Sequence, residues 1–348
     1  MLIQAEIRSI DLRNASEAEY AALSDFANTL RAEILPDDPP VPLEERRRSW
    51  QSIPPVVEVP TWALWEGGRV VATASAEVLK LEENKHAMSF DVRVLPEFRR
   101  RGIARRLLAQ VLETARRHQR RLLIANTSGR IPAGEAFMER LGAERGLETH
   151  TNQLELAHLD RELVRRWQEE ARARALGYRL ELVEGPYPEA DYPAIADLVN
   201  VMNTAPRDRL EVEDFTMTPE LLRHQERSAF ASGGWRWSYF ARDPGGRLAG
   251  YTEVYGHPNR PQVIHQGATG VRPEHRGAGL GRWLKAAMLE RILQRQPHAR
   301  FVRTGNADSN GPMLKINYEL GFKPYISSVV WQVPADKVAG YLGEAAPG

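Results

Sequence analysis

A short glycine-rich motif occurs twice in this chain, at nearly half-chain spacing, and it constrains the fold more than any other feature. The second copy is Arg276-Gly277-Ala278-Gly279-Leu280-Gly281, and the earlier copy is Arg99-Arg100-Arg101-Gly102-Ile103-Ala104. Each copy begins five residues after a valine, Val271 or Val94, that belongs to a strand-like run, and each opens a run with helical spacing. A repeat of this kind in 348 residues predicts two related domains.

The motif itself predicts an anion site. Where a strand leads into a helix, the first N–H groups of the helix have no partner in the chain, and the helix dipole adds positive charge there. Glycine lets the backbone approach a ligand closely, and arginine can donate two hydrogen bonds to a phosphate. We therefore expect a phosphate group at the second copy and, less strongly, at the first. The alternative is a glycine-rich turn beside solvated arginines, which Arg99–Arg101 alone would favour.

The repeat extends beyond the motif. Each half begins with a strand-like segment and a polar, helix-prone stretch, and then reaches a Gly-Gly hairpin signal. After the motif and its helix come a short apolar strand, a polar loop and a short helix that ends at glycine. This order predicts an α/β (α+β) fold with two tandem domains, each a mixed, mostly antiparallel sheet flanked by helices. The expected boundaries are 1–157 and 177–348, with a charged linker helix over 158–176.

Composition excludes several classes of protein and site. The 47 basic and 46 acidic residues give a net charge of +1, so we expect neither a nucleic-acid nor a membrane partner. The chain has no cysteine, which excludes disulfides, thiolate zinc sites and a cysteine nucleophile, and we expect no metal. The first residues favour a strand rather than a signal peptide, so a cytoplasmic location is expected.

Two segments in the second half carry a resemblance to a known family. Residues 269–285 read TGVRPEHRGAGLGRWLK, and residues 310–322 read NGPMLKINYELGF. With the order of elements above, they resemble the GNAT family of N-acetyltransferases, occurring twice. The first half matches more loosely, through Val92–Leu108 and Glu135–Ala143. The layout is similar to that of tandem acetyltransferases such as mycothiol synthase, although nothing in the sequence indicates that substrate.

The resemblance implies that acetyl-CoA, or another acyl-CoA, is the acyl donor. It places the pyrophosphate on the amides of residues 276–281 and the pantetheine arm along Thr269, Gly270 and Val271. The amide near Val271 would polarise the thioester carbonyl. Asn306 and Asn310 would contact the arm in the loop after the next strand. In the first half, the corresponding contacts are expected from Val94, Arg99, Gly102 and Ala104.

Transfer of an acyl group from a thioester to an amine needs positioning and a proton acceptor. The resemblance places the general base six residues before the strand valine, at His265 in the second half and Met88 in the first. Histidine can accept a proton near neutral pH, whereas methionine cannot. Glu253, on the preceding strand, is a second candidate. Either residue could instead be an ordinary strand residue.

The general acid is missing from its expected place. The resemblance implies a tyrosine four residues before the glycine of Gly-Phe, but that place holds Asn317 in the second half and Met138 in the first. This loss favours a non-catalytic acyl-CoA-binding regulatory protein as an alternative function. His265 and the intact second motif favour an N-acyltransferase with a catalytic second half and a degenerate first half. The acceptor would be a small-molecule or peptide amine; the sequence leaves its identity, the acyl chain and the oligomeric state open.

Overall fold

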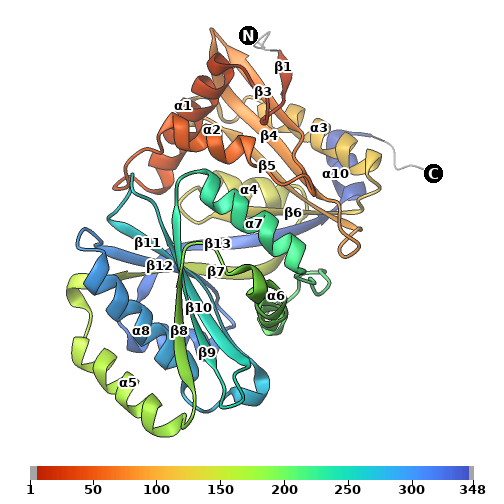
Figure 1. The fold of residues 1–348 in the computed structure, drawn as a ribbon. Helices are drawn as coiled ribbons and strands as arrows, with labels where there is room; N and C mark the ends of the chain where they lie inside the picture. The colour runs from red at the N-terminus through yellow and green to blue at the C-terminus, as the bar shows by residue number, and fades with distance from the viewer. Residues whose placement is uncertain (1–5, 345–348) are drawn as a thin grey trace. The chain divides into compact units, whose positions relative to one another are not determined.

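The computed structural model describes residues 6–344, which form two compact units (Figure 1). Unit 1 comprises the chain up to Glu148, the short segment Arg207–Glu213 and the residues from Ser327 onward. Unit 2 comprises Thr149–Pro206 and Asp214–Ile326. Each unit has a mixed, mostly antiparallel sheet flanked by helices, so the predicted fold class is confirmed.

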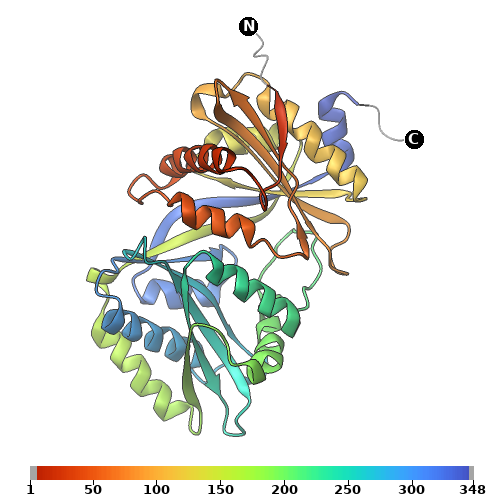
Figure 2. The ribbon, with the colours of Figure 1, turned by 45° about the horizontal axis from the view of Figure 1, so that its top comes forward.

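Unit 1 is built on a sheet with one parallel pair of strands. Its strands lie in the order β1 (Ile7–Ile10), β3 (Thr61–Glu66), β4 (Arg69–Leu79), β5 (Ala87–Val94), β6 (Leu122–Ser128) and the end of β13 (Lys323–Pro334). Among the described strands of unit 1, only β5 and β6 run parallel, and the short β2 (Val57–Glu58) pairs with β4. The helices are α1 (Glu17–Ile34), α2 (Leu43–Gln51), α3 (Ile103–Arg117), α4 (Pro132–Arg140) and α10 (Ala335–Leu342). Figure 2 shows α1 and α2 over one face of this sheet.

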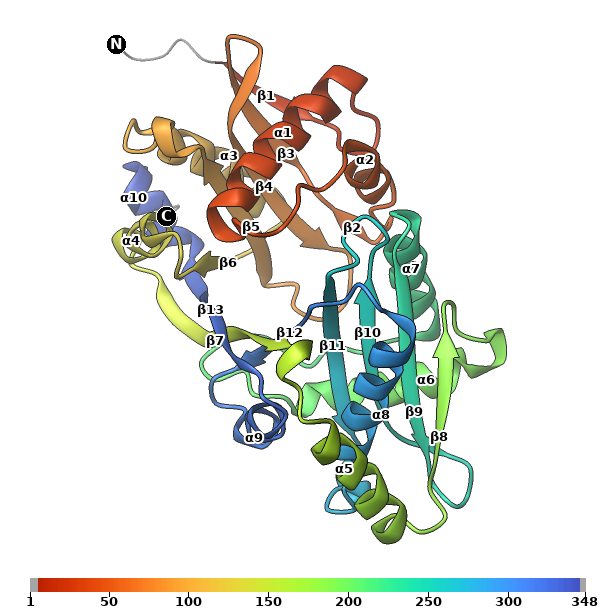
Figure 3. The same ribbon diagram turned by 90° about the vertical axis from the view of Figure 1, so that its left-hand side faces the viewer.

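Unit 2 repeats this plan. Its strands lie in the order β8 (Arg179–Glu184), β9 (Trp235–Arg242), β10 (Leu248–Gly256), β11 (Val263–Val271), β12 (Phe301–Ala307) and the end of β7 (Glu144–Glu155). The helices are α5 (Arg161–Arg174), α6 (Tyr192–Val199), α7 (Pro219–Ala231), α8 (Leu280–Arg295) and α9 (Gly311–Glu319). Helices α5 and α8 lie on one side of the sheet, and α6 and α7 lie on the other (Figure 3).

The helices that follow the two motifs form because their apolar residues recur with helical spacing. In α3 the predicted stripe, which includes Leu107, Leu108 and Val111, is fully buried against the sheet. In α8 the stripe formed by Leu284, Met288 and others is buried as well. Burial of each such side chain contributes about 1.5–3 kcal/mol, so the stripes fix both helices on their sheets.

Each sheet is completed by a strand from the other half of the sequence. Residues 149–155 of β7 pair with β12 in unit 2, and residues 328–334 of β13 pair with β6 in unit 1. The compact units therefore do not coincide with the two halves of the sequence. The stretch 158–176 contains α5, whose Val164 and Trp167 are buried in the core of unit 2. The boundaries expected from the sequence, 1–157 and 177–348, describe where the repeat divides the sequence, and they remain a prediction.

One irregularity distinguishes the two sheets. In unit 1, β4 and β5 pair without interruption from Ala72 with Val94 to Glu77 with Ser89. In unit 2, the pairing of β10 with β11 shifts register between Thr252 and Val254, which is a β-bulge. Bulges of this kind re-aim side chains and occur frequently beside active sites.

Candidate functional site

The two glycine-rich motifs have the same backbone conformation. Gly277 and Gly279 both have a φ of 84° in unit 2, and Arg100 and Gly102 have φ values of 62° and 77° in unit 1. Gly279 and Gly102 are the N-cap residues of α8 and α3, and neither helix start is capped by a side chain. The first amides of both helices are thus left without a side-chain partner, which is the arrangement that anion-binding turns use. Unit 1 holds an arginine in a left-handed conformation that glycine adopts without strain.

The motif arginines differ in what their guanidinium groups bind. Each donates its Nε group to the carbonyl of the strand valine at 3.1 Å. In unit 1, the terminal nitrogens of Arg99 donate to both carboxylate oxygens of Glu33, at 2.7 and 2.5 Å. In unit 2, Arg276 donates to the hydroxyl of Thr204 at 2.9 Å and is exposed. Arg276 can therefore offer its charge to a phosphate, whereas the charge of Arg99 is already neutralised.

The other motif residues contribute mainly backbone. The side chain of Leu280 is 1% exposed and packs in the core of unit 2, so only its amide can reach a ligand. Ala278 is partly buried against the same core. A Cβ at Gly281 would lie 3.5 Å from the side chain of Ile316, an ordinary contact, and Ala104 carries such a Cβ in unit 1.

Strand β11 parts from β12 before it reaches the motif. The parallel pairing runs from Val263 with Phe301 to Gln266 with Thr304, and within residues 6–344 no pair of these strands follows it. The later part of β11 holds the predicted arm-binding residues Thr269, Gly270 and Val271. The hydroxyl of Thr269 lies 2.7 Å from that of Thr252. A Cβ at Gly270 would lie 2.5 Å from Val201 Cγ1, so only glycine fits there.

Glu253 lies on β10, opposite the bulge in β11, on the face of the sheet that α6 and α7 cover. Its carboxylate accepts hydrogen bonds from the hydroxyls of Tyr255 and Tyr187 and from the amide of Ala268. Burial raises the pKa of Glu253 above its ordinary value and outweighs these hydrogen bonds. A Cβ at Gly267 would lie 2.9 Å from Glu253 Cγ, so the glycine leaves room for this carboxylate.

A buried ion pair holds the surroundings of Glu253. Arg236 and Glu226 are 3% and 6% exposed, and Arg236 donates to Glu226 and to the carbonyl of Gly185. Glu226 also accepts from the amide of Tyr187 at 3.0 Å and from the hydroxyl of Tyr192. The guanidinium of Arg236 lies 3.5 Å from the centroid of the Tyr187 ring. Sequence analysis missed these residues, although Arg236 stands as a charge between two tryptophans in a strand-like run.

His265 lies at the edge of the region around Glu253. It is exposed, pairs across the sheet with Tyr255 and lies beside Arg303 of β12. The prediction that Met88 is the counterpart of His265 in unit 1 is wrong. Ser89 holds that register, because it pairs with the third residue of β6 as His265 pairs with the third residue of β12. The bulge adds one residue to β11, and Met88 points instead into the core of unit 1.

The predicted asparagines lie on β12 and at the start of α9. Asn310 is the N-cap of α9, and its Oδ1 atom accepts from the amide of Met313 at 3.3 Å. Asn306 accepts a hydrogen bond of 2.7 Å from Asn317, which is fully buried in α9. Tyr318, next to the expected acid position, is 48% exposed.

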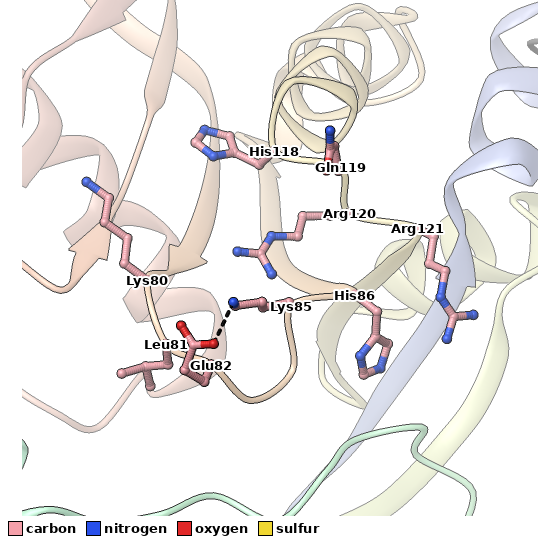
Figure 4. A pocket seen from close by; sticks show the side chains of 9 residues that line it. All are labelled: Lys80, Leu81, Glu82, Lys85, His86, His118, Gln119, Arg120 and Arg121. Carbon is pink, nitrogen blue, oxygen red and sulfur yellow. Dashed lines mark hydrogen bonds and ion pairs between the residues drawn. The ribbon is translucent and has the colours of Figure 1, made fainter.

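A pocket of about 610 Å³ lies elsewhere, in unit 1, and contains none of the predicted site residues (Figure 4). Its lining is mostly basic, but these cations are held by neighbours: Lys85 pairs with Glu82 at 2.7 Å, and Arg120 donates to the carbonyls of Leu79 and Asn84. The part of the chain that the structure describes contains no cluster of His, Asp or Glu that could hold a metal. None of the helices in residues 6–344 has the length and apolarity that a membrane crossing requires.

Comparisons with known proteins agree with this architecture. The acetyltransferase (GNAT) family model matches residues 25–143 and 196–322. A tandem GNAT protein from the clavulanic acid biosynthesis pathway, solved without AcCoA, is 28% identical, with a TM-score of 0.77 over 95% of this chain and 99% of that one. A GCN5-related N-acetyltransferase from Sphaerobacter thermophilus has the same fold, with 16% identity and a TM-score of 0.64 over 94% and 96% of the two chains. A search among curated proteins found no match. The chain belongs to the GNAT acetyltransferase family and carries the GNAT fold twice.

Proposed function

We propose that this protein is an acyl-CoA-dependent N-acyltransferase that moves an acetyl group directly from CoA to a primary amine. The family supports acyl transfer from CoA. Within residues 6–344, the motif of unit 2 combines helix-start amides that no side chain caps with an arginine that no carboxylate neutralises. This difference from unit 1 supports a donor site in unit 2, formed by Arg276–Gly281 for the pyrophosphate and Thr269–Val271 for the pantetheine arm. Asn306 and Asn310 would contact the same arm.

In unit 1, the corresponding residues Val94, Arg99, Gly102 and Ala104 would form a weaker site. The ion pair between Arg99 and Glu33 supports this ranking, since a phosphate would have to displace or tolerate the carboxylate. Unit 1 would then contribute mainly to the architecture, because Ser75 holds the place in β4 that Glu253 holds in β10.

The observation that carries the proposed chemistry is the position of Glu253. It is a carboxylate of raised pKa opposite a bulge in β11, whereas the corresponding strands β4 and β5 of unit 1 pair without interruption. We assign it as the general base. The neutral amine attacks the thioester carbon, the C–N bond forms, the C–S bond breaks, and the amine proton passes to Glu253 directly or through one water. His265, the second candidate for the base, is exposed and lies at the rim of the same face.

Turnover of acetyl-CoA with a panel of small-molecule and peptide amines, followed by release of free thiol, tests the proposal. Glu253→Gln and His265→Ala decide between the two bases, since only loss of the true base removes the acidic limb of the pH–rate profile. Ser75→Ala is the matched control, because Ser75 holds the register of Glu253 in unit 1. Tight binding of acetyl-CoA without turnover of any amine would instead support the non-catalytic regulatory protein.

A further inference from the structure

Three asparagine carboxamides meet in unit 2, where β7, β12 and α9 lie together. Asn152 and Asn317 are fully buried, and their Nδ2 groups both donate to Oδ1 of Asn306, at 3.3 and 2.7 Å. Asn152 also donates to the carbonyl oxygen of His150 at 3.4 Å, which assigns its nitrogen to that side. The Oδ1 atoms of Asn152 and Asn317 are therefore the groups without partners in this cluster.

These two oxygen atoms are buried acceptors. Within the part of the chain that the structure describes, no group donates a hydrogen bond to Oδ1 of Asn152 or of Asn317. A buried acceptor without a donor costs about 1–3 kcal/mol. Folded proteins nearly always satisfy such groups, with ordered water where no protein group is available. Two acceptors in one cluster point to a ligand that donates hydrogen bonds.

Unit 1 shows that the fold does not require amides at these places. By strand register and helix position, the corresponding residues of unit 1 are Trp331, Thr127 and Met138. Trp331 donates its Nε1 group to Thr127 Oγ1 at 2.7 Å. Trp331 and Met138 are 1% and 2% exposed. The three positions are thus mostly apolar in unit 1 and leave no such pair of open acceptors there. In unit 2, which carries Glu253, the same three positions hold carboxamides.

The cluster borders the place where β11 and β12 part. The last pair that joins these strands is Gln266 with Thr304, two residues before Asn306. Under the proposed function, the pantetheine arm lies along Thr269–Val271 and brings the thioester sulfur toward this part of β12. The cluster is then near the leaving group, whereas Glu253 belongs to the opposite face of the sheet.

We propose that Asn152, Asn306 and Asn317 hold ordered water against the sulfur of the acyl donor. This inference rests on the proposed function. A water that donates one hydrogen to Asn317 Oδ1 keeps its second O–H for the sulfur. As the C–S bond breaks, that O–H stabilises the thiolate, which then takes a proton from solvent through the water, while Glu253 keeps the proton of the amine. The asparagines are positioning residues, and the water serves because Asn317 stands where the resemblance implies a tyrosine acid.

The pKa of the CoA thiol in its complex with the protein tests this directly. Ultraviolet absorbance of the thiolate reports that pKa without any acyl transfer. A hydrogen bond from the held water favours the thiolate, so the bound thiol is expected to have a pKa about one unit lower in the wild type than in Asn317→Met. This substitution copies Met138 of unit 1, and Met138→Leu is the matched control, expected to leave the thiol unchanged.

Kinetics provide a second readout. Asn317→Met is expected to lower kcat by about 10²-fold and to leave the KM for acetyl-CoA nearly unchanged, because the lost contact forms with the departing sulfur. Asn306→Thr, which copies Thr127, gives the same comparison if Asn317→Met does not fold. Equal thiol pKa values in the wild type and the folded variants overturn the inference, even where turnover is normal. A shifted thiol pKa without turnover of any amine overturns the proposed function and leaves the water site standing.

Discussion

The guanidinium of Arg99 is held by Glu33 in unit 1, whereas its counterpart Arg276 in unit 2 donates to the hydroxyl of Thr204. The two motifs share their backbone conformation, so this difference in charge separates them. A phosphate at the first motif meets a carboxylate already in place, and repulsion between the two anions opposes binding. We infer that CoA binds the two units with unequal affinity.

Calorimetric titration with CoA checks this inequality. Gly279→Glu places a charged side chain in a left-handed turn at the second motif and is expected to abolish the tight site, whereas Gly102→Glu should leave it intact. In the Gly279→Glu background, Glu33→Gln frees Arg99 and should raise the remaining affinity about tenfold. Loss of the tight site through Gly102→Glu alone would reverse the ranking of the units.

Glu253→Gln should separate activity from stability. Loss of the base is expected to lower kcat by about 10²–10⁴-fold, with little change in acetyl-CoA affinity. The acidic limb of the wild-type profile should lie above the ordinary carboxyl pKa, because burial raises the pKa of Glu253. If Glu253→Gln keeps that limb and His265→Ala removes it, His265 is the base.

The raised pKa also fixes the sign of the stability effect. A carboxyl with a higher pKa in the folded state contributes stability below its unfolded pKa, and this contribution is lost as the pH rises through the folded pKa. Glu253→Gln removes a partly buried charge, so the variant should unfold at a higher temperature than the wild type at neutral pH. Unfolding curves measured across the acidic range should show a smaller fall in stability with pH for the variant.

Lys285 is a buried amine whose titration should appear in the stability of unit 2. It is 2% exposed, its ammonium lies 5.7 Å from the centroid of the Phe322 ring, and burial lowers its pKa to about 7. The unfolded chain holds this proton up to about pH 10.4, so the free energy of unfolding should rise with pH between about 7 and 10.4. Lys285→Met should be more stable than the wild type below about pH 7 and should flatten this rise. The exposed Lys315 supplies the control, since Lys315→Met should show neither effect.

Met88→Ala tests whether this part of unit 1 serves packing alone. Met88 is 2% exposed in the core, and its truncation should lower the free energy of unfolding by about 2–5 kcal/mol. Turnover, measured at a temperature where the variant stays folded, should change little. A large loss of turnover in a well-folded variant would show that unit 1 takes part in the chemistry.

The sequence predicted features that depend on neighbours along the chain. The Gly67-Gly68 hairpin forms with φ values of 56° and 80°, and Gly142 and Gly321 end their helices with φ values of 68° and 91°. The apolar stripes of α3 and α8 are buried as their spacing predicted. Each of these follows from the backbone freedom of glycine or from a helical period, which act within a few residues.

Tertiary structure decided what depends on pairing between distant segments. Because β11 contains a bulge, the counterpart of His265 in unit 1 is Ser89 and not Met88. The alternation of apolar and polar residues along a strand does not reveal where a bulge occurs. The end of β7 pairs with β12 and the end of β13 pairs with β6, so each strand joins the sheet formed by the other half of the sequence. A strand can pair with any sheet edge whose register matches its own. The pKa of Glu253 is raised by burial and held back by Tyr255, Arg236 and Tyr187, and only folding produces that burial and brings those groups to the carboxylate. The sequence by itself therefore determined the family, the repeat and the glycine turns of the two motifs, which are local. The environment of Glu253 and the asparagine cluster required the three-dimensional packing of residues far apart in the chain.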